Sequence, residues 1–319
     1  MRVLVTGATG FVGAAVLPRL ARDGIPCVAA VRRPGVVWPA QIAESVVGDI
    51  DPDTNWTLAL KGVDAVVHLA ARVHVMQDAA ADPLAAYRRT NVQASLNLAR
   101  QAAAGGVSRF IFVSSVKVNG EYTQKGQSFG ADDQPHPVDA YGISKMEAES
   151  GLWALAGESG MQVVIIRPPL VYGPGVKANF AAMMRWLHFG LPLPFGSVHN
   201  QRSLVALDNL VDLIAVCLVH PGAINQTFMA SDGEDISTSG LLRCLGEALG
   251  RPARLLAVPP VMLAAGATLI GRQHIARRLC DSLQVDIGKT RRLLDWAPPV
   301  TVADALGATA RAFLQNASA

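Results

Sequence analysis

The first thirteen residues, Met1–Gly13, read MRVLVTGATGFVG. Val3–Val5 form an uninterrupted apolar run, which is typical of a strand buried on both faces. Glycines follow at positions 7, 10 and 13, and apolar residues then recur at helical spacing as far as Leu20. This stretch predicts a strand, a tight glycine turn and a helix, and the rest of the chain is interpreted outward from it.

The glycine turn suits a bound pyrophosphate. Glycine allows a tight turn and a close ligand approach, and the following helix offers unpaired N–H groups and a positive dipole end. The spacing is G-x-x-G-x-x-G, not the G-x-G-x-x-G dinucleotide fingerprint. Its place between a strand and a helix still favours nucleotide binding over a plain turn. The predicted cofactor contacts here are Gly7, Thr9, Gly10, Phe11, Val12 and Gly13.

Strand-like apolar runs alternate with helical patterns through the first half of the chain. Such alternation predicts a parallel sheet covered by helices on both faces, that is, a doubly wound α/β fold of the Rossmann kind. We predict strands at 2–5, 26–31, 45–47, 64–69, 109–113 and 162–166, and helices at 11–23, 83–104 and 140–158.

Prolines and glycines become frequent after Arg167. We expect a nucleotide-binding domain over 1–169, to which 203–230 returns, and a smaller C-terminal substrate-binding lobe made of 170–202 and 231–319. In this half we predict helical or mixed structure at 203–219, a strand at 225–230, and helices at 237–249, 260–270 and 302–315. The segments expected to shape the substrate pocket are 73–82, 116–125 and 170–200.

The composition bounds the class of protein. Half of the residues are apolar and 17% are charged, which indicates a globular chain. A net charge of +3 without a long basic run gives no reason to expect nucleic-acid binding. The four cysteines are scattered without metal-ligand spacing, so we expect reduced thiols, no metal site and a cytoplasmic protein.

We expect no signal peptide, because the first strand begins at once. The most apolar segment, 255–270, is interrupted by Pro259 and Pro260 and is shorter than the roughly twenty residues that span a bilayer. It predicts a loop and a helix, with peripheral membrane contact left open.

Two arginines end the second predicted strand. Arg32 and Arg33 stand where an acidic residue would bind the ribose of NAD and where an arginine accommodates the 2′-phosphate of NADP. They favour NADP(H) over NAD as the cofactor. A carboxylate at Asp49 could accept from the adenine amino group, while His68 is interpreted as a packed strand-end histidine. The predicted contacts after the third and fourth strands are Asp49, Ile50, Leu69, Ala70 and Ala71.

Three side chains could carry proton transfer. Ser115 follows the strand at 109–113, and Tyr141 and Lys145 lie four residues apart, on one helix face. A lysine ammonium near a phenol lowers the phenol pKa from about 10, so the tyrosine could exchange a proton with a sugar hydroxyl or ketone. The serine could orient that oxygen while a nicotinamide takes or gives the hydride. We predict Ser115, Tyr141 and Lys145 as catalytic, the last two also contacting the cofactor.

The motifs occur together in family order: TGATGFVG, HLAA, FVSSVKVNG, YGISK and RPPLVYGPG. In this the whole chain resembles the extended short-chain dehydrogenases/reductases, the NAD-dependent epimerase/dehydratase family that acts on nucleotide sugars. The resemblance implies a homodimer through the helices at 83–104 and 140–158. It also implies that Asn91 and Pro168 serve the cofactor and that Ser115, Asn179 and Arg202 bind the substrate, Arg202 through its diphosphate.

Three positions depart from the family pattern. Asn119 stands where the family has the tyrosine of V-Y-G, and Leu170 where it has the asparagine of R-x-x-N. The arginines after the second strand differ from many epimerases that hold NAD tightly. The SSVKVNGE sequence resembles bacterial enzymes that build deoxy-aminosugars for surface polysaccharides.

We therefore favour an NADPH-dependent reduction of a UDP-4-keto-6-deoxy-N-acetylhexosamine at C4. The alternative is a UDP-glucose or UDP-N-acetylglucosamine 4-epimerase with bound NAD. A dehydratase is disfavoured, because Val116 and Lys117 replace the Asp-Glu pair of that branch. A non-catalytic dinucleotide sensor is a distant alternative, since it would have no use for an intact Ser115, Tyr141 and Lys145.

Overall fold

The computed structural model describes residues 1–73, 82–269, 277 and 279–317. Residues 74–81, most of a segment predicted to shape the substrate pocket, lie outside the described residues. So does residue 270, the predicted end of the helix at 260–270.

A seven-stranded sheet of order β3-β2-β1-β4-β5-β6-β9 forms the centre of the first part of the chain. Every neighbouring pair is parallel, which confirms the predicted doubly wound α/β fold. The chain order reverses between β1 and β4, and ligands of such sheets bind outside the carboxyl ends at this switch point. The strands are β1 (Val3–Thr6), β2 (Cys27–Val31), β3 (Ile42–Val46), β4 (Ala65–His68), β5 (Arg109–Val113), β6 (Gln162–Arg167) and β9 (Gln226–Met229).

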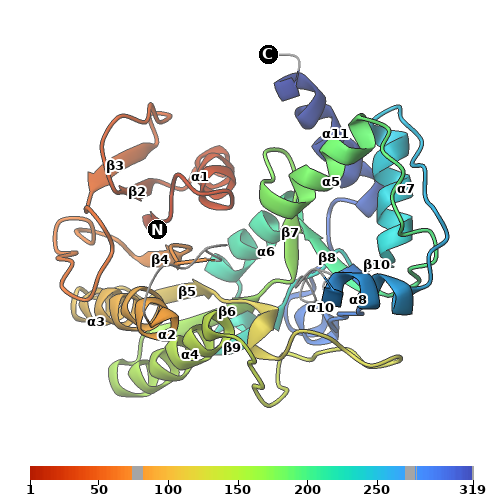
Figure 1. Cartoon of the computed structure of the whole chain (residues 1–319). Helices are drawn as coiled ribbons and strands as arrows, with labels where there is room; N and C mark the ends of the chain where they lie inside the picture. Colours follow the sequence, from red (N-terminus) through yellow and green to blue (C-terminus); the bar gives the residue numbers. More distant parts are fainter. Residues whose placement is uncertain (74–81, 270–276, 278, 318–319) are drawn as a thin grey trace.

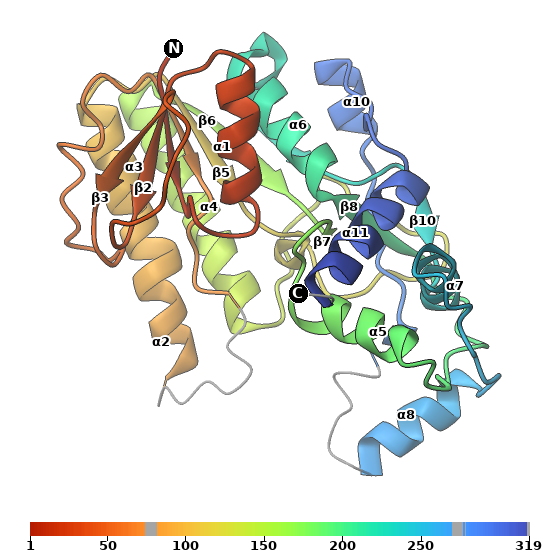
Figure 2. The ribbon, with the colours of Figure 1, turned by 90° about the horizontal axis from the view of Figure 1, so that it is seen from above.

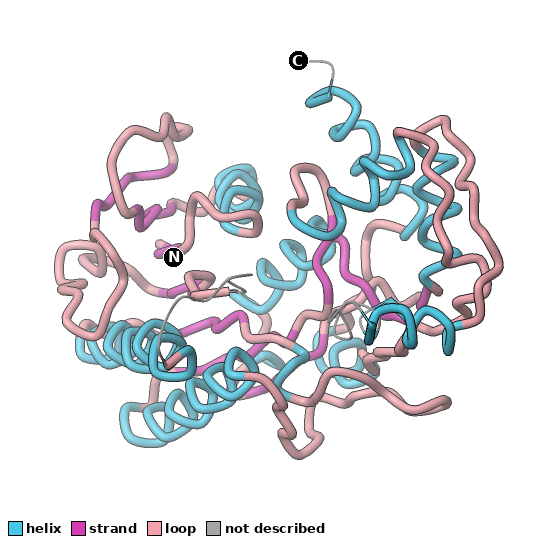
Figure 3. The backbone as a smooth tube through the Cα atoms, in the orientation of Figure 1, coloured by secondary structure: helices cyan, strands magenta, loops and turns pink. Residues whose placement is uncertain are grey.

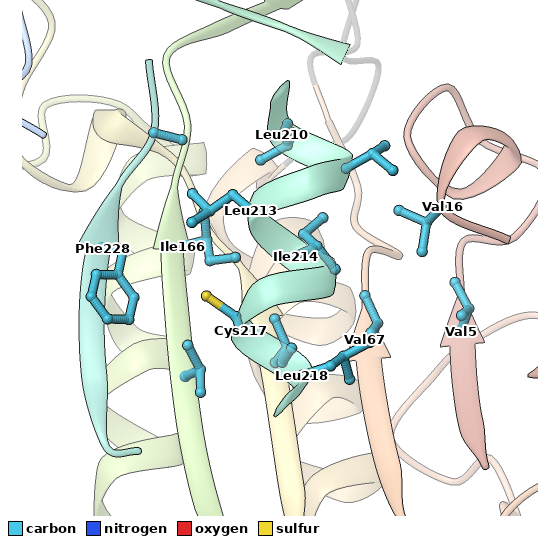
Figure 4. Close-up of a cluster of buried hydrophobic side chains, with 14 of the residues drawn as sticks. Val5, Val16, Val67, Ile166, Leu210, Leu213, Ile214, Cys217, Leu218 and Phe228 are labelled. Carbon is cyan, nitrogen blue, oxygen red and sulfur yellow. The ribbon is translucent and has the colours of Figure 1, made fainter. Parts of the chain in front are cut away.

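Helices cover both faces of this sheet (Figure 1). On one face lie α1 (Gly13–Arg22) and α6 (Leu207–Val219), and on the other α3 (Ser95–Ala104) and α4 (Ala140–Ser159). Figure 4 shows how Leu213 and Ile214 of α6 project toward Val67 and Ile166 of the strands. Burying such side chains contributes roughly 1.5–3 kcal/mol each, and this apolar packing fixes the strand ends that carry the site.

A smaller lobe contains a three-stranded sheet of order β10-β8-β7. Its core, which includes Tyr172, Phe180 and Leu306, is enclosed by α5, α7 and α11 (Figure 2). The segment 203–230 divides between the two sheets, because β8 belongs to the lobe sheet whereas β9 pairs with β6. The lobe elements are β7 (Leu170–Tyr172), β8 (Arg202–Ala206), β10 (Asp235–Ile236), α5 (Ala178–His188), α7 (Thr238–Ala248) and α11 (Val302–Ala317).

The predicted helix at 83–104 is a continuous helical segment in three parts (Figure 3). Its middle is a π-helical stretch, which the 3.6-residue period of an α-helix does not predict. Strand β7 was not predicted, since three residues are too few to show a period. The remaining elements are α2 (Pro83–Tyr87), η1 (Arg88–Ala94), η2 (Val116–Val118), η3 (Pro221–Ala223), α8 (Pro260–Leu269) and α10 (Gly288–Leu294). Within the described part of the chain, none of the helices combines the length and apolar character that crossing a bilayer takes.

Candidate active site

A cavity of about 920 Å³ opens at the carboxyl ends of β1, β2, β3 and β4. Its volume is in the range of small-molecule and cofactor sites. It lies at the switch point of the sheet, where a dinucleotide is expected. The predicted cofactor contacts that line it are Gly7, Thr9, Arg32, Arg33, Asp49, Ile50, Ala70 and Ala71.

The glycine loop forms the wall of the cavity next to α1. Gly7 has a φ of +63°, and a Cβ there would lie 2.9 Å from the backbone nitrogen of Ala70. A Cβ on Gly13 would lie 2.2 Å from the Gly7 carbonyl oxygen. Side chains at these positions would therefore collide with backbone, and a backbone cradle of this kind fits a bound pyrophosphate.

Other predicted contacts in this region do not line the cavity: Gly10, Phe11, Val12, Gly13 and Leu69. Gly10 donates its N–H to the Gly7 carbonyl over 2.9 Å, and so helps to shape the loop. Leu69 donates its N–H to the Thr6 hydroxyl over 3.2 Å.

Arg32, the first of the two arginines after β2, is paired with a carboxylate. The Arg32 Nε atom lies 3.0 Å from an Asp49 carboxylate oxygen, and both side chains are largely exposed. The residue predicted to meet a 2′-phosphate is therefore paired with the residue predicted to meet the adenine. An exposed pair of this kind contributes only about 0–1 kcal/mol to stability, so a ligand can rearrange it.

A buried polar chain connects the glycine loop with β4 and α3. The Thr6 hydroxyl accepts N–H groups from Leu69 and Ala70 at 3.2 Å, and it lies 2.6 Å from His68 Nδ1. Burial lowers the pKa of His68 to about 3, with a smaller contribution from the charge of Lys145. The neutral ring has one donor and one acceptor nitrogen, so it can join the Thr6 hydroxyl to Ser95 Oγ, which lies 2.8 Å from Nε2. The assignment of His68 to packing missed this role in holding the cavity wall, because Ser95 is distant in sequence.

Asn91 lies in η1 and is fully buried. Its side-chain oxygen accepts from the Arg72 N–H at 2.8 Å, while its nitrogen donates to the Arg72 carbonyl and, at 3.0 Å, to Ser144 Oγ. These bonds fasten the chain that follows β4 to α4, between Tyr141 and Lys145. Asn91 therefore supports the cavity through protein contacts, and a direct contact with the cofactor stays a prediction.

Helix α4 begins next to Ser115. Asp139 caps the helix by accepting the Gly142 N–H at 2.7 Å, and Tyr141 occupies the first turn. The Tyr141 and Ser115 side chains share a hydrogen bond. Lys145 is buried one turn further on, donates to the Val113 carbonyl over 2.9 Å and lies over the Phe112 ring. The structure thus brings all three predicted catalytic residues together, where the carboxyl end of β5 meets the first turns of α4.

The pKa of Tyr141 shifts in the direction opposite to the one predicted. Burial raises it above its usual value, the negative charge of Asp139 adds to the rise, and the hydrogen bond with Ser115 opposes it. Burial also lowers the pKa of Lys145 to about 7. A lysine that is only partly charged near neutral pH offers the phenol little stabilisation, and this explains why the predicted lowering is wrong for the ligand-free protein.

Two neighbours of Ser115 were not predicted as parts of the site. Lys117 pairs with the capping carboxylate Asp139, and with Glu121 at 2.9 Å. From the sequence, Lys117 was only a reason to disfavour a dehydratase. The buried Ser114 hydroxyl finds no hydrogen-bond partner among the residues described, and a buried polar group of this kind favours a bound molecule that would satisfy it.

Asn119, which departs from the family pattern, takes part in a buried network with an ion pair. Arg167 and Glu149 form an ion pair whose side chains are 5% and 4% exposed, with contacts of 2.5 and 3.0 Å. Asn119 accepts from Arg167 at 3.1 Å. Pro168, a predicted cofactor contact, accepts the Val116 N–H through its carbonyl at 3.0 Å. These contacts join α4, β6 and the turn after Ser115.

The two residues assigned to the substrate lie in the lobe. Asn179 is exposed in the first turn of α5. Arg202 begins β8 and donates from Nη1 to the Asp281 carbonyl over 3.0 Å. No cluster of three or more His, Cys, Asp or Glu side chains suited to a metal occurs in the described ranges.

Comparison with known proteins places the chain in a protein family. The model of the NAD dependent epimerase/dehydratase family matches residues 3–229. The chain is 49% identical over 314 residues to a UDP-glucose 4-epimerase of Vibrio cholerae, which covers 98% of this chain and 95% of that relative. The chain is also 25% identical to a 4-epimerase of Escherichia coli O157:H7 that is named for N-acetylglucosaminyl-diphospho-undecaprenol. That match covers 96% of this chain and 93% of the relative.

Solved structures share the fold over nearly the whole chain. A UDP-glucose 4-epimerase of Thermotoga maritima with UDP-glucose superposes with a TM-score of 0.79 at 23% identity, over 99% of this chain and 100% of that one. A UDP-glucuronic acid 4-epimerase of Bacillus cereus with NAD gives 0.78 at 20% identity, over 99% of each chain.

Proposed function

The chain is an enzyme of the NAD-dependent epimerase/dehydratase family, and from this premise we propose that it is a UDP-sugar 4-epimerase that works with NAD in the cavity at the switch point. The observation that carries the proposal is the 49% identity to a UDP-glucose 4-epimerase over nearly all of both chains. We set this function above the reduction of a 4-keto sugar that the sequence favoured.

The cavity supports NAD as the dinucleotide. The glycine cradle suits the pyrophosphate, and Asp49 is placed next to Arg32 at 3.0 Å. A 2′-phosphate would meet the Asp49 carboxylate as well as the arginine, so this pair reduces the preference for NADP that two arginines alone would give. When bound, NAD would supply reversible hydride transfer at C4 of the sugar.

Tyr141 would act as the acid and base of the reaction. As the phenolate, after releasing its own proton to solvent, it takes the proton of the 4-hydroxyl group when the 4-keto sugar forms and returns it when the hydroxyl is restored on the other face. In the ligand-free protein the raised pKa keeps the phenol protonated. Lys145, whose pKa is about 7, can gain a positive charge near neutral pH and stabilise the phenolate.

Ser115 would orient the same sugar oxygen. Its hydroxyl bonds Tyr141 and also accepts the Lys117 N–H at 3.2 Å, so its position is fixed from two sides. A hydroxyl held in this way costs little reorganisation when the substrate arrives.

The diphosphate of the UDP-sugar would lie between Arg202 and the N-terminus of α5, which carries Asn179. An arginine fork matches phosphate oxygens, and the first turn of an eleven-residue helix attracts anions. The homodimer through the helical segment 83–104 and α4 is likewise our proposal. Its interface would include Ile143, Met146 and Trp153, which keep part of their surface exposed in the single chain.

The proposal is tested with the purified protein and UDP-glucose or UDP-N-acetylglucosamine, without added cofactor. We expect the C4 epimer to form, as followed by chromatography of the nucleotide sugars. If neither sugar turns over, while NADPH is consumed with a UDP-4-keto-6-deoxy-N-acetylhexosamine, the enzyme is the reductase instead.

A further inference from the structure

A set of large apolar side chains is exposed along the outer part of the lobe. We call it the α8 surface, and it consists of Phe189, Leu191, Leu256, Val261 and Met262, which are 72%, 46%, 54%, 80% and 63% exposed. The chain around Leu191 and Leu256 is joined by backbone pairing, since Leu193 donates its N–H to Arg254 and accepts that of Leu256, both at 2.8 Å. Figure 2 shows α8 at the outer edge of the lobe, beyond α5.

Helix α8 is apolar on all sides, with the sequence PVMLAAGATL. A helix of this composition is normally buried in a core or in a membrane. Here every residue of 260–268 keeps at least part of its surface exposed. At 1.5 Å per residue its ten residues span only about 15 Å, half of the hydrocarbon thickness of a bilayer. The ten described residues are too few to cross a bilayer, and their apolar side chains can enter only one leaflet.

The sequence on both sides of α8 carries charges of one sign. From Ala248 to Cys280 the sequence holds no Asp or Glu but five arginines, at 251, 254, 272, 277 and 278. Of these, Arg251, Arg254 and Arg277 are described and exposed. Basic groups next to an exposed apolar helix complement an anionic lipid surface.

A protein partner fits this surface less well. Specific protein interfaces carry direct hydrogen bonds beside their apolar contacts. Within 260–268 the side chains offer one hydroxyl, that of Thr268, and it already donates to the Ala264 carbonyl over 2.9 Å. An apolar helix without polar contacts is suited to lipid, which demands no register.

We propose that the α8 surface docks this enzyme onto an anionic membrane surface, with α8 lying in the interface and Arg251, Arg254 and Arg277 facing the lipid headgroups. The docking is independent of the reaction at Tyr141. It would hold the substrate lobe at the bilayer.

The test is flotation of the full chain with vesicles of phosphatidylcholine, either alone or mixed with phosphatidylglycerol. We expect binding to the anionic vesicles and a loss of binding as salt is raised, because salt screens the arginines. The variant Val261→Glu with Met262→Glu should bind at least about tenfold more weakly, since two apolar side chains no longer enter the lipid.

The matched control is Val37→Glu with Leu58→Glu, which changes two side chains that are 97% and 86% exposed outside the α8 surface. This control should bind vesicles as the unaltered protein does. Circular dichroism checks that both variants are folded. The proposal is overturned if the unaltered protein floats with neither kind of vesicle, or if the Val261/Met262 variant binds like the control. It is also overturned if the unaltered protein self-associates in sedimentation without binding lipid and the Val261/Met262 variant does not self-associate. A second copy of the chain would then cover the surface.

Discussion

Tyr141 combines burial, a hydrogen bond to Ser115 and a raised pKa at the start of α4. We predict that Tyr141→Phe lowers turnover by about 10²–10⁴, the usual contribution of a positioned acid or base. The measurement is steady-state turnover with UDP-glucose. Tyr122→Phe is the control, since Tyr122 is 59% exposed and should leave turnover unchanged. Equal turnover of Tyr141→Phe and the unaltered enzyme would remove Tyr141 from the mechanism.

His68 couples stability to pH. Its pKa is about 3 in the folded chain and about 6.5 when exposed. Between these values the unfolded chain binds a proton that the folded one does not, so stability falls as the pH is lowered from about 6.5 toward 3, by up to about 1.4 kcal/mol per pH unit.

We therefore predict that His68→Gln reduces the loss of unfolding free energy between pH 7 and pH 5, as measured by urea denaturation. His199→Gln, at an exposed position, is the control and should show the same loss as the unaltered protein. A loss that His68→Gln leaves unchanged would contradict a buried neutral imidazole.

Sequence reasoning at the residue scale identified side chains that are close in the chain or that follow strands. Tyr141 and Lys145 share a helix face, and Ser115 follows β5, so their meeting could be predicted. Two other contacts could not be predicted: the one that joins Thr6 to Ser95 through His68, and the one between Lys117 and Asp139. They depend on which buried groups remain to be paired after the chain has folded, and the pKa of Tyr141 depends on the same burial.

At the scale of elements, the glycine loop depends on contacts between backbone segments. A Cβ on Gly13 would lie 2.2 Å from the Gly7 carbonyl, so Gly13→Ala should lower the unfolding free energy by about 1–3 kcal/mol and weaken NAD binding. Urea denaturation and NAD titration measure the two effects. The control is Gly157→Ala in α4, where a Cβ meets nothing within 4 Å among the described residues and should stabilise by roughly 0.5–1 kcal/mol. Equal stability of the two variants would contradict the collision.

Helix α4 is fastened to β6 by the buried pair of Glu149 and Arg167. Glu149→Ala leaves the guanidinium buried without its partner, so we predict a loss of about 3–5 kcal/mol in unfolding free energy. Glu147→Ala is the control, since its pair with Arg88 is partly exposed and screened by solvent, so its loss should cost much less than that of the buried pair.

The double variant Glu149→Met with Arg167→Met removes both charges and should recover part of the stability lost in Glu149→Ala. If Glu149→Ala costs no more than Glu147→Ala, the pair does not fasten α4.

The main elements of the doubly wound sheet were predicted from their periods, but the eleven-residue helix α5 of the lobe was not, because frequent prolines and glycines flank it in the sequence. The parallel strands and α4 follow apolar runs and helical spacing closely. The π-helical turn around Asn91 and the short β7 were missed, because the first is fixed by the contacts of Asn91 with Arg72 and Ser144, and the second by pairing with β8.

For the whole molecule, the strand order places the cavity at the switch point next to the end of β4, while the proposed diphosphate contacts Asn179 and Arg202 come from distant segments of the lobe. In the proposed 4-epimerase, hydride leaves the sugar and returns to the same carbon within one active site. The epimerase retains that hydride, whereas a reductase must take it from NADPH in solution.

The most direct measurement uses UDP-glucose deuterated at C4, incubated with the purified enzyme without added NADPH, followed by mass and NMR analysis of the sugar. We predict that the C4 epimer forms and keeps its deuterium at C4. Absence of the epimer, or an epimer formed only with NADPH and carrying its hydrogen at C4, would contradict the account.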